Sequence, residues 1–222
     1  KMKPLLIVLL LISFTQSVAI ANEETTGDVK GLKVKITRNI ESVVIGHNGK
    51  KVKIQRNQNT KNKINPDFAY TSRKCPPFCI QPIKLAPGVE TIAETEMIDY
   101  LIKKENGDDN IVVIDSRGAS WVKKGTIPGS INIHFKKLSL KHGDEAEIAE
   151  IFEDTFGVMR TAEFWNFKNA KTLVLFCNGM WCGQAPTSIK ALLKIGYPAH
   201  KLKWYRGGMQ SWEILGLTTV KP

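Results

Sequence analysis

The feature that most limits the fold of this chain is a pair of continuous apolar runs. Each run is followed directly by polar residues or a loop. One is NIVVIDSR at residues 110–117, and the other is KTLVLFC at residues 171–177. Runs rich in β-branched residues, without alternating polar positions, are typical of strands buried on both faces of a parallel sheet. Parallel strands need long crossover connections, usually helices. The two runs therefore predict an α/β domain.

The segments around these runs have the periodicity that such a domain requires. Pro186 suits the first turn of the last long helix, and Gly196 should end it. The order of elements predicts a three-layer α/β domain with a mostly parallel sheet over residues 86–222. We expect helices at 91–104, 144–156, 185–197 and 208–216, and further strands within 125–135 and 201–207.

A small β-rich module is predicted at residues 22–85. Residues 32–39 alternate apolar and basic side chains, which predicts a half-buried strand. Residues 42–57 alternate in the same way on both sides of Asn48-Gly49, a strong hairpin signal. Four prolines within 73–88 exclude an interior helix or central strand, so this part should be an irregular connector.

Positive charge is concentrated in the front of the chain. Residues 22–90 carry 13 Lys and Arg against 6 Asp and Glu, whereas residues 91–222 carry 17 against 15. This imbalance permits contact with an acidic protein or an anionic membrane surface, and a merely solvated basic surface is the alternative. There is no base-reading motif, so we expect no nucleic-acid partner.

The first 21 residues have the pattern of a secretory signal. Lys1 and Lys3 precede an apolar run from Leu5 to Ile12, and Ala19-Ile20-Ala21 resembles a cleavage site. The apolar run is short for a bilayer span, so a retained membrane anchor is the alternative. We therefore expect an exported, periplasmic protein cleaved after Ala21.

Export changes what the four cysteines can do. Outside the cytosol thiols tend to oxidise, and four cysteines allow three pairings. Cys75 and Cys79 are close enough in sequence to form a local bridge in the proline-rich connector. A zinc site that uses all four cysteines is an alternative with loose spacing.

Cys177 stands at the end of a predicted strand, where active sites of open α/β sheets lie. Gly179 and Gly183 allow the following loop to curl, so that its N–H groups can hold an anion. The next helix directs its positive end to the same point. A thiol there should ionise easily and act as a nucleophile. An inert buried thiol is the alternative.

The arrangement resembles the rhodanese (sulfurtransferase) family across residues 90–217. Asp115 and Arg117, followed by Gly125, Ile127, Pro128, Gly129 and Ser130, are similar to one family segment, and LLKIGY follows the loop as in the family. Gly207, Gly208, Trp212 and Gly216 match its closing signature. We expect Asp115 and Arg117 to be structural, and Trp204 and Trp212 to lie in the core.

The resemblance implies that Cys177 accepts a sulfane sulfur, carries it as a persulfide, and passes it to a thiol or cyanide. It implies no metal and no organic cofactor. The loop that would hold the transferred group consists of Asn178, Gly179, Met180, Trp181, Cys182 and Gly183. We expect Trp181 to be exposed at the loop tip, where it could cover the pocket, dock a partner or act as an apolar plug.

Two features depart from the family pattern. The loop is longer than usual and lacks a basic residue, and Gly183 stands where related phosphatases have arginine, which argues against phosphate hydrolysis. Cys182 lies inside the loop, so it could resolve a Cys177 persulfide or be a bystander. A thiol-disulfide oxidoreductase that uses both cysteines is the second hypothesis, and an inactive binding module is the third.

Overall fold

The computed structural model describes residues 31–139, 141, 143–161 and 164–222. The predicted signal sequence, residues 1–21, lies outside the described residues. Leu32–Pro222 form one compact unit. Within the described part of the chain, no helix has the length and apolar character needed to cross a bilayer.

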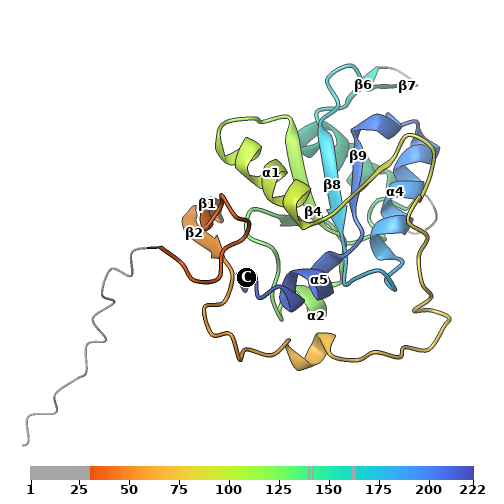
Figure 1. Ribbon diagram of the computed structural model, residues 1–222. Coiled ribbons are helices and arrows are strands. Elements are labelled where there is room, and N and C mark those ends of the chain that lie inside the picture. The colour runs from red at the N-terminus through yellow and green to blue at the C-terminus, as the bar shows by residue number, and fades with distance from the viewer. Residues whose placement is uncertain (1–30, 140, 142, 162–163) are drawn as a thin grey trace, which may run out of the picture. The chain divides into compact units, whose positions relative to one another are not determined.

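A five-stranded parallel sheet forms the centre of this unit (Figure 1), which confirms the predicted α/β class. Its order is β3-β9-β8-β4-β5. Every adjacent pair in this sheet is parallel. The strands are β3 (Glu90–Ile92), β9 (Leu202–Tyr205), β8 (Thr172–Phe176), β4 (Ile111–Asp115) and β5 (Ile131–Asn132).

The central strands are buried on both faces, as the apolar runs predicted. All five residues of β4 are buried. Ile111 and Val113 belong to one hydrophobic cluster, and Val112 and Ile114 belong to the other. Because successive strand side chains point to opposite faces, one strand contributes to two cores.

Helices cover both faces of the sheet, and Figure 1 shows α1 and α4 on opposite sides of it. The first core contains residues of α1 (Glu94–Glu105) and α5 (Gly208–Ile214). The second contains residues of α3 (Glu145–Glu150), of the π-helical turn η2 (Ile151–Thr155) and of α4 (Gln184–Ile195). The smaller elements are α2 (Ala119–Val122), η1 (Pro66–Phe68), η3 (Ala199–Lys201), β6 (Met159–Thr161) and β7 (Phe164–Asn166).

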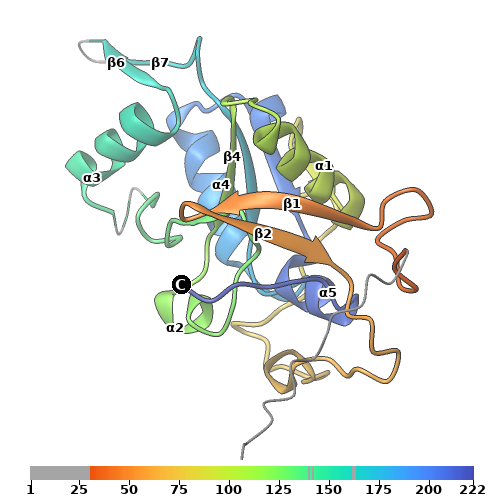
Figure 2. The same cartoon turned by 90° about the vertical axis from the view of Figure 1, so that its left-hand side faces the viewer.

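The predicted hairpin is present as β1 (Ser42–His47) and β2 (Lys50–Gln55), an antiparallel pair. Asn48 and Gly49 both have positive φ, 48° and 75°, as the tight turn between the strands requires. Figure 2 shows the hairpin in front of the sheet and next to α1. Ile45 and Ile54 are buried in the same core as Leu101 of α1. The β-rich front segment is thus packed on the α/β fold.

Three local predictions differ from the structure. Residues 32–39 are irregular, not a strand, because their backbone meets side chains: the Val34 N–H donates to Gln58 Oε1 at 3.1 Å. The predicted helix at 91–104 begins later, because its first residues form β3 beside β9. Within 144–156 the α-helix ends at Glu150 and continues as a π-helical turn.

Candidate active site

The loop after β8 begins at Cys177, at the carboxyl edge of the sheet, where the sequence predicted it. Gly183 caps α4, which starts at Gln184 and ends before Gly196 (φ 98°), as predicted. The loop thus joins a central strand directly to the N-terminus of a 12-residue helix. Such a terminus favours negative charge, because its first N–H groups have no partner within the helix.

A buried ion pair at the end of β4 is hydrogen-bonded to the start of this loop. Arg117 donates from Nε to Asp115 Oδ1 at 2.8 Å and from Nη2 to Asp115 Oδ2 at 2.6 Å. Its Nη1 donates to Asn178 Oδ1 at 3.3 Å. Both charged residues are completely buried. The structural role predicted for Asp115 and Arg117 is confirmed, and they connect two neighbouring strand ends.

The start of α5 holds the loop from another side. The backbone N–H of Met209 donates to the Cys177 carbonyl, and that of Gln210 donates to the Asn178 carbonyl, both at 2.9 Å. Gly208, in the predicted closing signature, has φ 54°. A Cβ at Gly208 would lie 2.3 Å from the Cys177 carbonyl oxygen. This close approach of two backbones therefore requires glycine.

Cys177 and Cys182 are both free thiols and both buried, with exposed fractions of 1% and 4%. The Cys177 thiol donates to the Cys182 carbonyl oxygen at 3.3 Å. The Cys182 thiol lies 3.7 Å from Gln184 Oε1. The loop therefore curls so that both thiols lie beneath its surface, where each side chain influences the other.

The two thiols differ in acidity, and the difference reverses our expectation for Cys177. Burial raises the pKa of Cys177 well above its ordinary value, and the neighbouring Cys182 raises it further. The backbone N–H groups of Ala185 and Gly179 act in the opposite direction, but burial outweighs them. The neighbouring Cys177 side chain is the main cause that lowers the pKa of Cys182, and burial acts in the opposite direction. Of the two thiols, Cys177 therefore holds its proton more tightly, and Cys182 is the more acidic.

Trp181 is buried, not exposed as expected, with an exposed fraction of 8%. Its Nε1 donates to Gln210 Oε1 at 2.8 Å, and its ring belongs to the same hydrophobic cluster as both cysteines. The apolar-plug alternative is therefore the one that the structure bears out. Met180 is instead the exposed residue of the loop, at 41%.

Trp181 is buried partly because residues 70–83, here called the strap, lie against it. The Phe78 and Trp181 rings pack nearly at right angles, with centroids 5.6 Å apart. The Arg73 guanidinium lies 3.9 Å from the centroid of the same ring. No sequence signal indicated this contact, because the strap and the loop are about a hundred residues apart in the chain.

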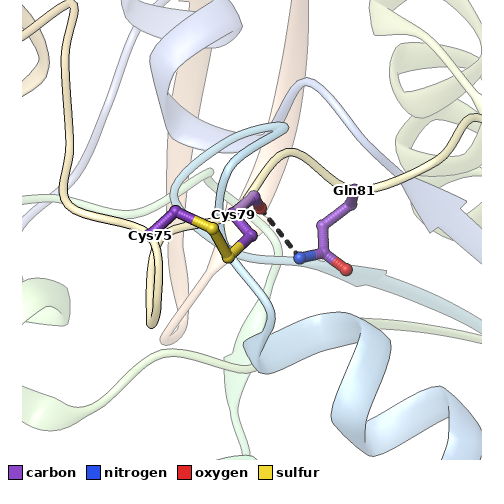
Figure 3. Close-up of a disulfide and its surroundings, with 3 residues drawn as sticks. All are labelled: Cys75, Cys79 and Gln81. Atoms are coloured by element: carbon purple, nitrogen blue, oxygen red, sulfur yellow. Dashed lines mark hydrogen bonds between the residues drawn. A yellow bond between two sulfur atoms is a disulfide. The ribbon is translucent and has the colours of Figure 1, made fainter.

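Cys75 and Cys79 form a disulfide within the strap (Figure 3). The Gln81 amide donates from Nε2 to the Cys79 carbonyl at 2.9 Å. Because Cys75 and Cys79 are bonded to each other, the four-cysteine zinc alternative is wrong. Among the residues that the structure describes, no three His, Cys, Asp or Glu side chains gather in a metal-binding cluster.

The fold is similar to several solved structures of low sequence identity. A rhodanese-like domain from Anabaena sp. is 13% identical, covers 60% of this chain and 79% of its own, and has a TM-score of 0.38. The human single-domain sulfurtransferase is 18% identical, with coverages of 55% and 93% and a TM-score of 0.35. A possible tyrosine phosphatase from Rhodopseudomonas palustris is 19% identical, with coverages of 60% and 85% and a TM-score of 0.42.

A search of curated proteins gave no match. The family model described as Rhodanese-like domain matches residues 99–215, which is more than half of the chain. This match includes β4, β8, β9, α4 and the loop that contains both free cysteines. The chain therefore belongs to the rhodanese-like domain family.

Proposed function

We propose that this protein is a sulfurtransferase that moves a sulfane sulfur from a donor to a thiol acceptor through a persulfide on Cys177. The observation that carries the proposal is the position of Cys177. It lies at the carboxyl end of β8, and the N–H groups of Gly179 and Ala185 interact with its sulfur. These groups and the start of α4 would stabilise the negative charge of a persulfide.

Cys182 gives the proposed step a proton acceptor. In the first step Cys177 transfers its proton to Cys182, and the Cys177 sulfur attacks the outer sulfur of the donor. The donor's sulfur–sulfur bond breaks, the donor leaves as an anion, and Cys177 becomes a persulfide. In the second step the acceptor thiolate attacks the outer sulfur, and Cys177 leaves as a thiolate. Burial of Cys177 makes the first proton transfer the costly part of this sequence.

The neighbouring thiols also favour a second candidate, a thiol-disulfide oxidoreductase. The Cys182 thiolate could attack the inner sulfur of the Cys177 persulfide, which would release hydrosulfide and leave a Cys177–Cys182 disulfide. An external dithiol would then have to reduce this disulfide. The opposite pKa shifts of the two thiols support this hypothesis, because a thiol of lowered pKa beside one that keeps its proton suits exchange chemistry.

Intact mass spectrometry of the reduced full chain tests both candidates. After incubation with thiosulfate or a small-molecule persulfide, sulfur transfer predicts an adduct of one sulfur atom. The adduct should be lost in Cys177→Ser. In Cys182→Ser it should still form, but more slowly, because water must then accept the Cys177 proton. The two variants are matched controls, because each removes one buried thiol from the same loop.

Other outcomes separate the remaining hypotheses. A loss of two hydrogens that maps to residues 177–182, without a sulfur adduct, would support the oxidoreductase. If neither mass change occurs with any donor or oxidant, both enzyme hypotheses are contradicted and the binding module is favoured.

We also propose that the protein is exported, because its disulfide lies in a strap that solvent can reach. Disulfides persist mainly in oxidising compartments, and Cys75 is exposed. The basic side chains within 22–90 would then face an acidic protein or an anionic membrane surface. Fractionation of cells that express the full-length protein would test export, and recovery of the whole protein in the cytosol would contradict it.

A further inference from the structure

We propose that the strap is a redox-controlled cover over the cysteine pair, held closed by the Cys75–Cys79 disulfide and opened when a thiol reduces that disulfide. The inference concerns control of the site in the proposed function. Its test measures access to the thiols and does not depend on sulfur transfer.

The strap contacts the part of the loop that covers the cysteines. Phe78 and Arg73 pack on Trp181, and the Gln81 N–H donates to the Met180 carbonyl at 2.8 Å. Trp181 in turn packs in one cluster with Cys177 and Cys182. The strap therefore fixes the tip of the loop in the position that buries both thiols.

The disulfide fixes the turn that presents Phe78. This turn is the five-residue ring from Cys75 to Cys79, and its Phe78 N–H donates to the carbonyl of Lys74, the residue before the ring, at 3.0 Å. Between η1 and β3 the strap belongs to no helix or strand, so no repeating hydrogen-bond pattern holds it. A cross-link restricts the conformations of the open chain. Without it, ordering Phe78 against Trp181 becomes much less favourable.

The far end of the strap has a separate anchor. Arg206 directly follows β9, and its Nη2 donates to the Gln81 carbonyl at 2.8 Å. The Thr91 hydroxyl also hydrogen-bonds to the Ile83 carbonyl. Neither contact involves the disulfide. Reduction should therefore release residues 70–80 and leave the strap attached at Gln81 and beyond.

The bond is placed where a reductant can reach it. Cys75, Pro76 and Pro77 are exposed, and Cys79 is half-buried. Exposed disulfides are the more readily exchanged ones. Two thiol groups of a dithiol, or of two small thiols, would reduce Cys75–Cys79 to two cysteine thiols and become a disulfide themselves. Cys177 and Cys182 are already reduced and take no part in this exchange.

Opening would also change the chemistry of the pair. Burial is the main cause of the raised Cys177 pKa, so water reaching the loop would lower that pKa. The same thiol-rich surroundings that supply a sulfur acceptor would then also activate the nucleophile. The enzyme would remain closed where no thiol is present.

Alkylation kinetics of the full chain test this proposal. The oxidised chain and the same chain after reduction and removal of the reductant are treated with iodoacetamide, and the modification of Cys177 and Cys182 is followed by peptide mass spectrometry. We expect both to react about tenfold or more faster after reduction. Hydrogen exchange should rise in residues 70–80 and 177–183 while β4 and β8 stay protected.

Variants separate a cover from a passive staple. Cys75→Ser/Cys79→Ser should react like the reduced chain without any reductant, and Phe78→Ala should react faster with the disulfide intact. Ile83→Ala is the matched control, because Ile83 is an exposed apolar strap residue (67%) outside the contact with Trp181. It should react like the unaltered chain. Equal alkylation and equal exchange in the oxidised and reduced chains would overturn the proposal, even if the double variant were unstable.

Discussion

The floor and the cover of the cysteine pair are built in different ways. The floor consists of a buried ion pair at the end of β4 and a glycine contact at the start of α5, and each position is set by several bonds at once. The cover is the strap, an irregular segment held by one cross-link, two side chains on Trp181 and a few hydrogen bonds. One site thus combines a rigid floor with a cover that can be released.

If the floor is rigid because its charges are buried together, Arg117→Ala should have the largest effect. It leaves the Asp115 carboxylate buried without its partner, which costs about 3 to 5 kcal/mol of unfolding free energy. Urea denaturation followed by circular dichroism would measure the loss.

The control for this change is Lys124→Ala, which removes an ion pair with Asp67 on the surface. Both partners of that pair are about 40% exposed (43% and 38%), so the loss should stay below about 1 kcal/mol. Similar losses in the two variants would contradict the importance of the buried pair.

Gly208→Ala should have the next largest effect. The new Cβ would collide with the Cys177 carbonyl, and the positive φ would add strain, so we expect a loss of about 3 kcal/mol. Thermal and urea unfolding would measure it.

Gly107→Ala is the matched control for strain alone. Gly107 also has a positive φ, 97°, but a Cβ there would meet no atom within 4 Å. The loss should be only about 1 kcal/mol. If Gly208→Ala cost no more than Gly107→Ala, the close approach at the loop would not matter.

Burial of the Cys177 thiol above this floor should also make stability depend on alkaline pH. Above about pH 9, the ordinary thiol value, the unfolded chain loses the Cys177 proton while the folded chain keeps it, because its pKa is raised. Stability from Cys177 is therefore complete below pH 9 and falls as the pH rises, by up to about 1.4 kcal/mol per pH unit. Cys182 has a lowered pKa, so it affects stability below pH 9: its contribution to the free energy of unfolding is lost as the pH falls.

Urea unfolding between about pH 9 and 10 would show this dependence, before the buried tyrosines with raised pKa contribute. Cys177→Ala should have a shallower slope there. A slope unchanged by Cys177→Ala would mean that its thiol is not held protonated in the folded chain.

The cover should contribute least to global stability. Phe78 is 41% exposed and contacts the loop through one aromatic pair with Trp181, so Phe78→Ala should reduce the unfolding free energy by about 1 kcal/mol or less. The measurement is urea unfolding of the oxidised chain. A loss of several kcal/mol would show that the strap contributes to global stability as much as the floor does, and would contradict the difference between them.

The sequence predicted the sheet well because its signals are local. Continuous apolar runs gave β4 and β8, and Asn48-Gly49 gave the hairpin turn. The same local reasoning failed at residues 32–39, where alternation suggested a strand but no strand among the described residues pairs with it. A strand needs a partner, and a pattern within one segment cannot supply one.

The candidate site divides in the same way. The position of Cys177 at a strand end follows from local pattern. The roles of Gln210, Phe78 and Arg73 do not, because each contacts Trp181 from a distant part of the chain. Burial of the pair also reversed the expected acidity of Cys177, since the cost of burying a charge depends on what covers it.

By itself the sequence determined the α/β class, the strand that ends in Cys177, and the local bridge between Cys75 and Cys79 as one of its alternatives. Only the tertiary structure decided that the bridged strap lies over the loop and that Cys182, not Cys177, is the more acidic thiol of the pair. The reason is that periodicity and turn chemistry act between neighbours in the chain, whereas burial and electrostatics act between neighbours in space.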